Sequence, residues 1–242
     1  MKANHTHKLF FRKYAYKATI RCPRVAVIRY PDHQNLTFLS KAETFGEYCN
    51  LLRKTKQGFL LTTWDNETQH TKRLWEARFL IFKILSMKEK LLNQGVSFTL
   101  RLESDTCGFY TNDAQSWNEV CRMFKDNIID ICWPKDNKHL NYLLTNPTNE
   151  IVKDYPYQKY QYRINLRSVM LPNSLRENFR EWVNSYNDVK ISDITINTVE
   201  KGGYTLNGKF LYSTNKKMML LLQMYLGNAI KDITEFKLEK EL

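Results

Sequence analysis

The chain has few of the residues that interrupt or cross-link a fold. Its 242 residues include only 8 Gly and 6 Pro, with no Ser/Gly-rich or Gln-rich tract, so we expect no long disordered linker or low-complexity tail. The cysteines form an odd set without CxxC spacing, namely Cys22, Cys49, Cys107, Cys121 and Cys132. This pattern argues against a disulfide framework and against a structural zinc site. Buried free thiols are expected instead.

Long apolar runs are missing as well. The most apolar stretch, 79–85, is short and contains Lys83, whereas a membrane span needs about 18 consecutive apolar residues. The first five residues are polar and lack the apolar segment of a signal peptide. We therefore expect a soluble, cytoplasmic protein without membrane contact. With 43% hydrophobic and 13% aromatic residues, the chain is able to bury a core.

Acidic residues are absent from the first 31 positions, and the whole chain has a formal net charge of +12. Aromatic residues such as Phe10 and Tyr14 alternate with the cations in this segment. These cations are Lys2, Lys8, Arg12, Lys13, Lys17, Arg21, Arg24 and Arg29. Such a run is typical of proteins that bind a phosphate-rich partner. A solvated basic face without a partner is the alternative.

The chain repeats itself. Residues 13–21 match 159–167 with Lys, Tyr, Tyr and Arg identical, which is an offset of 146 residues. Residues 109–113 match 211–215 at an offset of 102, and the match continues without a gap to 128–131 and 230–233. The difference between the offsets indicates 44 extra residues in the first copy. Both copies keep the same order of elements.

Hydrophobic periodicity and capping residues give the elements of each copy. In the first copy we expect strands at 14–22, 96–102, 107–111 and 128–133, and helices at about 71–93 and 113–124, the second capped by Asp113. In the second copy we expect strands at 160–167, 189–198, 209–213 and 230–238, and helices at about 174–186 and 215–226. The insertion, at about 23–69, is predicted to add a strand at 25–30, a helix at 41–54 and a strand at 59–63.

This βαββαβ order resembles the ferredoxin-like fold that RNA-recognition motifs and the RAMP proteins of CRISPR systems share. The resemblance is one of topology and covers most of the chain. It implies an α+β protein with two tandem ferredoxin-like βαββαβ units, a first at 1–145 that is enlarged by the insertion and a second at 146–242. Fold by itself does not determine function.

Strand alternation divides the first strand of each copy into two faces. Tyr14, Tyr16 and Ile20, like Tyr160, Tyr162, Ile164 and Leu166, are predicted to face the core. The opposite faces carry Lys17, Thr19 and Arg21, and Gln161, Arg163, Asn165 and Arg167; the second strand adds Ser97, Thr99 and Arg101. A polar and basic sheet face favours phosphate contact over base stacking. The predicted nucleic-acid-binding residues are Lys8, Arg12, Lys13, Lys17, Arg21, Arg24, Arg101, Arg163 and Arg167.

An RNA-recognition motif would also place stacking aromatics on its first and third strands. Gly108-Phe109-Tyr110 and Gly208-Lys209-Phe210 are only fragments of that pattern. Asp130 and Asp232 recur at equivalent positions of the two copies, and we interpret them as edge or capping residues.

A metal-independent, RAMP-like RNA endonuclease is the catalytic alternative, and it needs a general base such as His. His5 and His7 lie in a segment expected to be flexible, and His33, His70 and His139 lie in or beside predicted loops. The Gly-rich loop that such nucleases carry before their last strand is reduced to Gly227-Asn228. No GxxxxGK[ST], GxGxxG or HExxH motif occurs, so we expect neither a cofactor nor a metal.

The favoured hypothesis is a non-enzymatic protein that binds RNA or single-stranded DNA through the basic N-terminal segment and the sheet faces. A viral or phage structural or assembly protein is the alternative from a different class. In that case the repeat would build interfaces with protein partners or a homo-oligomer.

Overall fold

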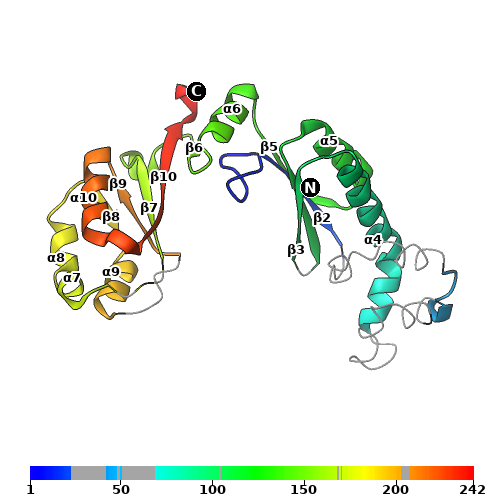
Figure 1. The fold of residues 1–242 in the computed structure, drawn as a ribbon, viewed down its shortest axis with the longest axis horizontal. Coiled ribbons are helices and arrows are strands. Elements are labelled where there is room, and N and C mark those ends of the chain that lie inside the picture. Colours follow the sequence, from blue (N-terminus) through cyan, green and yellow to red (C-terminus); the bar gives the residue numbers. More distant parts are fainter. Residues whose placement is uncertain are drawn as a thin grey trace. The chain divides into compact units, whose positions relative to one another are not determined.

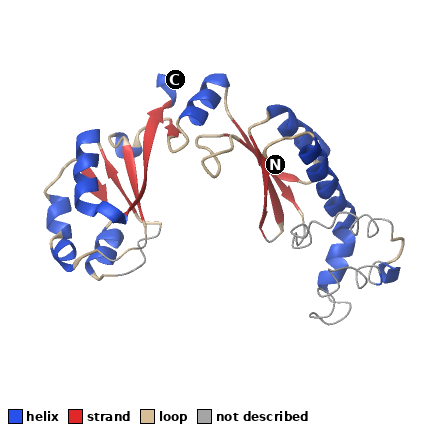
Figure 2. Ribbon diagram, in the orientation of Figure 1, coloured by secondary structure: helices blue, strands red, loops and turns tan. Residues whose placement is uncertain are grey.

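The structure is a computed structural model that describes residues 1–22, 42–47, 50, 69–103, 105–167, 169, 171–202 and 208–242. The chain divides into two compact units, one formed by Met1–Thr6 and Lys13–Lys135 and the other by His7–Arg12 and Asp136–Leu242. Each unit contains a five-stranded mixed sheet with helices packed against it (Figures 1 and 2). The predicted α+β class is therefore confirmed.

The insertion lies largely outside the described residues. The strands expected at 25–30 and 59–63 and the predicted site residue Arg24 fall there. Of the helix expected at 41–54, residues 42–47 and 50 are described; 45–47 and 50 are helical, and 42–44 are not.

The first unit has the sheet order β1-β5-β2-β4-β3. Its elements are β1 (Lys2–His5), β2 (Tyr16–Arg21), α4 (Gln69–Asn93), β3 (Phe98–Glu103), β4 (Thr106–Thr111), α5 (Ala114–Met123) and β5 (Ile128–Trp133). Strand β1 runs parallel to β5, and the other pairs are antiparallel. Ala18, Ile20 and Phe109 face the helices and pack with Ile84 and Val120 in a buried core.

The second unit has the sheet order β6-β10-β7-β9-β8. Its elements are α6 (Asn137–Thr145), β6 (Glu150–Val152), η2 (Pro156–Gln158), β7 (Tyr162–Leu166), α7 (Asn173–Glu177), α8 (Phe179–Asn184), β8 (Val189–Ile191), α9 (Asp193–Glu200), β9 (Phe210–Ser213), α10 (Lys216–Leu226), η3 (Gly227–Ala229), β10 (Ile230–Leu238) and η4 (Glu239–Glu241). Strand β6 runs parallel to β10, as β1 does to β5. Ile164 and Leu211 pack with Phe179 and Leu222 in the core between sheet and helices.

The two sheets therefore have the same strand order, including an outer strand that sequence reasoning missed in both. The missed strands β1 and β6 are only four and three residues long. All four residues of β1 are exposed, so neither alternation nor a hydrophobic run marks it.

Two predicted elements of the second unit were wrong in extent. The β-branched stretch 189–198 forms a strand only to Ile191, because Ser192 accepts a hydrogen bond from the Thr195 N–H and starts α9. Thr195, Ile196 and Val199 are buried on one side of that helix, so helical spacing and the cap override β-propensity. The helix expected at 174–186 is divided at Asn178 into α7 and α8.

The cysteines within the described residues, Cys22, Cys107, Cys121 and Cys132, are free, as expected. Burial raises the pKa of the Cys22 and Cys107 thiols to about 12. These thiols therefore stay protonated near neutral pH and act as small apolar core groups.

Candidate nucleic-acid interface

The sheet of the second unit has a polar face on the side away from its core. Arg163 pairs with Tyr212, and Asn165 pairs with both Phe210 and Asp232. Directly opposed residues of antiparallel strands lie on the same side of a sheet, so these side chains share one surface. We call it the second polar face; its members are Arg163, Asn165, Lys190, Phe210, Tyr212, Asp232 and Thr234.

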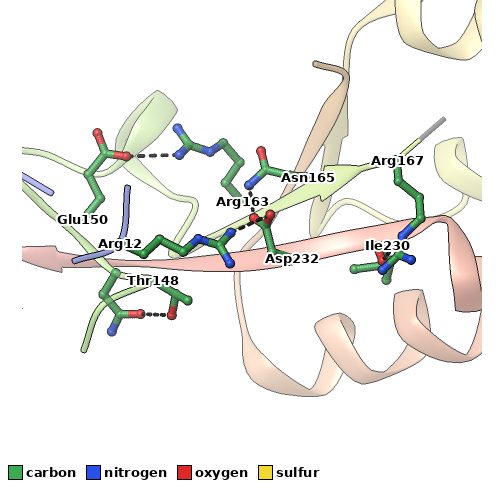
Figure 3. Close-up of polar contacts among 9 residues, drawn as sticks. Arg12, Thr148, Glu150, Arg163, Asn165, Arg167, Ile230 and Asp232 are labelled. Carbon is green, nitrogen blue, oxygen red and sulfur yellow. Dashed lines mark hydrogen bonds and ion pairs between the residues drawn. The ribbon is translucent and has the colours of Figure 1, made fainter. Parts of the chain in front are cut away.

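The N-terminal segment reaches this face because residues 7–12 belong to the second unit. The Ile151 N–H donates to the His7 carbonyl at 2.7 Å, next to edge strand β6. Lys8 Nζ then lies 3.8 Å from a Glu150 carboxylate oxygen. An Arg12 guanidinium nitrogen lies 2.6 Å from Asp232 Oδ2 (Figure 3). Two of the N-terminal cations are thus brought onto the sheet predicted for nucleic-acid contact.

Arg12 is held in an unusual backbone conformation. Phe11 and Arg12 have φ values of 54° and 56°, in the left-handed region that non-glycine residues rarely occupy. The Asp232 carboxylate, which Arg12 contacts from this turn, also accepts a hydrogen bond from Asn165 Nδ2 at 2.6 Å. The side chains of Arg12 and Asn165 therefore meet on one carboxylate, as Figure 3 shows.

A pocket of about 310 Å³ lies where this segment meets the polar face. Its lining includes four cations and two carboxylates, a formal excess of two positive charges, and these residues are Lys8, Arg12, Arg163, Lys231, Glu150 and Asp232. Arg163 donates one hydrogen bond to Glu150 at 3.1 Å, and a guanidinium has five donors. The pocket therefore keeps donors and positive charge for an anionic group.

An aromatic cluster lies on the same face beside the cations. The Tyr212 ring lies 5.3 Å from Phe210 and 5.7 Å from Tyr157, both in edge-to-face geometry, and 6.0 Å from Tyr160. Tyr157 is 68% exposed and Phe210 is 40% exposed. Tyr157 adopts a left-handed backbone with φ 53°, and Lys190 Nζ lies 5.8 Å from its ring centre.

A second pocket, of about 280 Å³, is built on this cluster. Tyr157, Phe210 and Tyr212 line it together with Lys190 and Lys209. Gly208 lines both pockets, so they adjoin. One pocket offers cationic donors and the other offers exposed ring faces.

Tyr14 and Tyr160, predicted to face the core, are buried, but neither belongs to the clusters packed between sheet and helices. Both belong to the polar side, where the Thr99 hydroxyl donates to the Tyr14 hydroxyl and the Tyr160 ring stacks on Tyr212. Strands β2 and β7 begin at Tyr16 and Tyr162, so the regular alternation does not extend back to the earlier tyrosines. Tyr16 and Tyr162 do pack against the cores, as predicted.

The polar face of the first sheet is built differently. Lys17 Nζ lies 2.7 Å from Asp130 Oδ2. Partial burial disfavours the charged amine, but the hydrogen bond and the charge of Asp130 outweigh it and raise the pKa of Lys17. Arg101 pairs with Glu103 at 2.6 Å. Tyr110, the counterpart of Tyr212, is buried over Gly108.

The eight predicted site residues that the structure describes are thus divided between the two units. Lys8, Arg12 and Arg163 line one pocket, and Arg167 is exposed nearby, with its Nε donating to the Ile230 carbonyl at 3.1 Å. Lys13, Lys17, Arg21 and Arg101 belong to the first unit. Sequence reasoning missed Lys190, Lys209 and Lys231 and the aromatic rings. The fragment Gly208-Lys209-Phe210 was the available signal.

Asp130 and Asp232, interpreted as edge or capping residues, bind cations on the polar faces. For Asp130 that interpretation was wrong, because β1 pairs with β5 at this residue. Strand β6 pairs with β10 only over Phe236–Leu238, so Asp232 lies on the part of β10 that β6 does not cover.

Among the described residues, no histidine lines either pocket. His5 lies in β1, with its ring 5.2 Å from Trp133, not in a flexible segment as expected. His139 is buried in α6, not in a loop, and its amide N–H donates to the capping carboxylate of Asp136 at 2.9 Å. Within the described ranges no His, Cys, Asp and Glu side chains gather in threes to hold a metal ion.

No family model, no curated protein and no solved structure matches this chain. Among the helices of the described residues, none combines the length and apolar character that crossing a bilayer requires.

Proposed function

We propose that the protein binds single-stranded nucleic acid, RNA or DNA, on the second polar face. The observation that carries this proposal is that exposed aromatic rings and an excess of cations over carboxylates occupy adjoining pockets on one sheet surface. Proteins that bind single strands combine these two features, because cations contact the phosphates while rings stack on the unpaired bases.

In this proposal one pocket binds the phosphates and the other binds a base. Backbone phosphates would contact Lys8, Arg12, Arg163 and Lys231, which outnumber the carboxylates beside them. A base would stack on Phe210 or Tyr157, the two rings with the largest exposed surface in the cluster. Bases in a duplex are already stacked and paired, so this arrangement favours a single strand.

We further propose that each unit is a ferredoxin-like domain with one added edge strand. Leaving β1 and β6 aside, the orders β5-β2-β4-β3 and β10-β7-β9-β8 both have the first and third strands of the βαββαβ unit in the centre. The sequence repeat supports the same architecture for the two copies.

Fluorescence anisotropy with a labelled single-stranded oligonucleotide tests the proposal. Phe210→Ala and Tyr157→Ala should each weaken binding by about 5- to 100-fold, the range for the loss of one base–aromatic stack. Phe79→Ala is the matched control, because Phe79 is 56% exposed on α4 of the first unit. It should leave the affinity unchanged.

RNA and DNA of one sequence are measured in parallel, with a duplex as competitor. No binding by the wild-type chain, equal losses in all three variants, or a duplex that competes as well as a single strand would each contradict the proposal. Circular dichroism confirms that the variants are folded.

A further inference from the structure

Helix α10 exposes an apolar row on its outer side. Leu220 is 51% exposed, Leu221 37% and Met224 83%. Met218, Leu222 and Leu226 point the other way and are buried in the core. Positions 220, 221 and 224 are neighbours on a helix surface, so the exposed side chains form one continuous patch.

The repeat provides an internal comparison for this patch. At the offset of 102 residues, α10 corresponds to α5, with Asn215 and Asp113 as the equivalent N-caps. The buried positions also correspond, since Ser116 and Val120 match Met218 and Leu222. The two helices thus pack on their sheets in the same way.

Their outward faces differ in chemistry. The face of α5 is made by Ala114, Gln115, Asn118, Glu119 and Arg122, whereas that of α10 is made by Lys216, Lys217, Leu220, Leu221 and Met224. Packing on the sheet needs no apolar residue at these outward positions, as α5 demonstrates. Contiguous exposed apolar residues on a soluble domain commonly mark an interaction surface.

The charge around the patch indicates what binds there. The two lysines of α10 occupy its first turn, and the helix contains no acidic residue. Carboxylates are favoured at a helix N-terminus, and cations are not. A ligand with carboxylates beside Lys216 and Lys217 would therefore be stabilised. A second α10 brings no carboxylate to this end.

We propose that the outward face of α10 binds an amphipathic helix of a partner protein. The partner helix would carry an apolar row against Leu220, Leu221 and Met224 and acidic residues against the two lysines. Helices are commonly recognised through apolar residues at i, i+3, i+4 and i+7 spacing. This surface belongs to the helical side of the second unit (Figure 1), so the proposal does not depend on nucleic-acid binding.

Two synthetic helical peptides serve as probes, with the same leucine row and with glutamates or lysines at the flanking positions. Titration is followed by fluorescence anisotropy. The wild-type chain should bind the acidic peptide at least tenfold more tightly than the basic one. The variant Leu220→Asn/Leu221→Glu/Met224→Arg, which carries the α5 residues, should lose that binding while its affinity for the oligonucleotide is unchanged.

A second variant, Lys216→Ala/Lys217→Gln, isolates the charge and should remove the preference for the acidic peptide. Equal binding by the wild-type chain and the triple variant would overturn the proposal. Equal binding of both peptides would overturn it as well. The same holds if the wild-type chain self-associates or binds lipid vesicles and the triple variant does neither. Circular dichroism identifies a variant that fails to fold, and the lysine variant then provides the test.

Discussion

Phe210 of the second sheet occupies the position that Gly108 occupies in the first, 102 residues earlier. In both sheets a tyrosine follows two residues later on the same face, Tyr212 in one and Tyr110 in the other. In the first sheet the tyrosine ring covers the glycine, and in the second it meets the partly exposed Phe210 ring edge-on at 5.3 Å. The first sheet thus buries its tyrosine ring against the glycine, whereas the second sheet leaves part of an aromatic ring exposed.

Gly108→Ala tests the packing of the Tyr110 ring on Gly108. A Cβ at Gly108 would lie 2.8 Å from Cε2 of Tyr110, which is buried. We expect a loss of about 1–3 kcal/mol in the free energy of unfolding, as for other overpacked sites. Urea denaturation measures it, with Gly46→Ala as the control because a Cβ there meets nothing within 4 Å. Equal stabilities of the two variants would mean that Tyr110 does not pack on Gly108.

Asp232→Asn should separate binding from stability. The substitution keeps an oxygen acceptor for Asn165 and removes the negative charge beside Arg12, so affinity for a single strand should rise by up to about fivefold. The cost in unfolding free energy should stay below about 1 kcal/mol, because the Arg12 side chain is half exposed and the new amide still accepts from Asn165. Asp130→Asn makes the same change at the equivalent position of the first sheet and should not alter the affinity. A similar rise in both variants would assign the effect to net charge alone.

The salt dependence of binding should come mainly from the second unit. Arg163→Gln/Arg167→Gln and Lys17→Gln/Arg21→Gln each remove two positive charges. The slope of log affinity against log salt should become shallower by about 1.4 in the first pair, since each phosphate contact on a single strand contributes about 0.7. The change in the second pair should be less than half as large. Equal changes in slope for the two double variants would contradict an interface on the second sheet.

The cap of α5 should make the first unit sensitive to acid. The hydroxyl and the amide N–H of Ser116 donate to Asp113 and lower the pKa of that carboxyl. A lowered folded-state pKa stabilises the fold above the unfolded value of 3.8, and this contribution is lost as the pH falls through the folded value.

The stability advantage of wild type over Asp113→Asn should therefore shrink as the pH is lowered from 5 to about 2, since an amide keeps its acceptor without titrating. Urea denaturation at several pH values measures it. Asn215→Asp, at the equivalent cap of α10, should make the second unit acid-sensitive in the same way, so the stability of wild type relative to this variant should grow as the pH falls. A pH-independent difference in the Asp113 variant would contradict the assigned cap.

Much of the secondary structure follows from local patterns. The caps Asp113 and Asn215 begin their helices where the sequence indicates, and the buried stripe of α10 follows from helical spacing. Local patterns failed where two signals competed, as at Ser192, whose cap turns a β-branched stretch into α9. They also failed where a strand has too few residues to show a period, as in β1.

The sequence alone determined that the chain holds two related α+β copies and a cation-rich N-terminus, because a repeat, a periodicity and a charge run are all properties of neighbouring residues. The tertiary structure decided that Arg12 meets Asp232, that Lys17 is neutralised by Asp130, and that Tyr212 lies opposite Arg163 and beside Tyr157 on one surface. These relationships depend on strand register and on contacts between residues up to 220 positions apart, as for Arg12 and Asp232. No pattern within a short window contains that information.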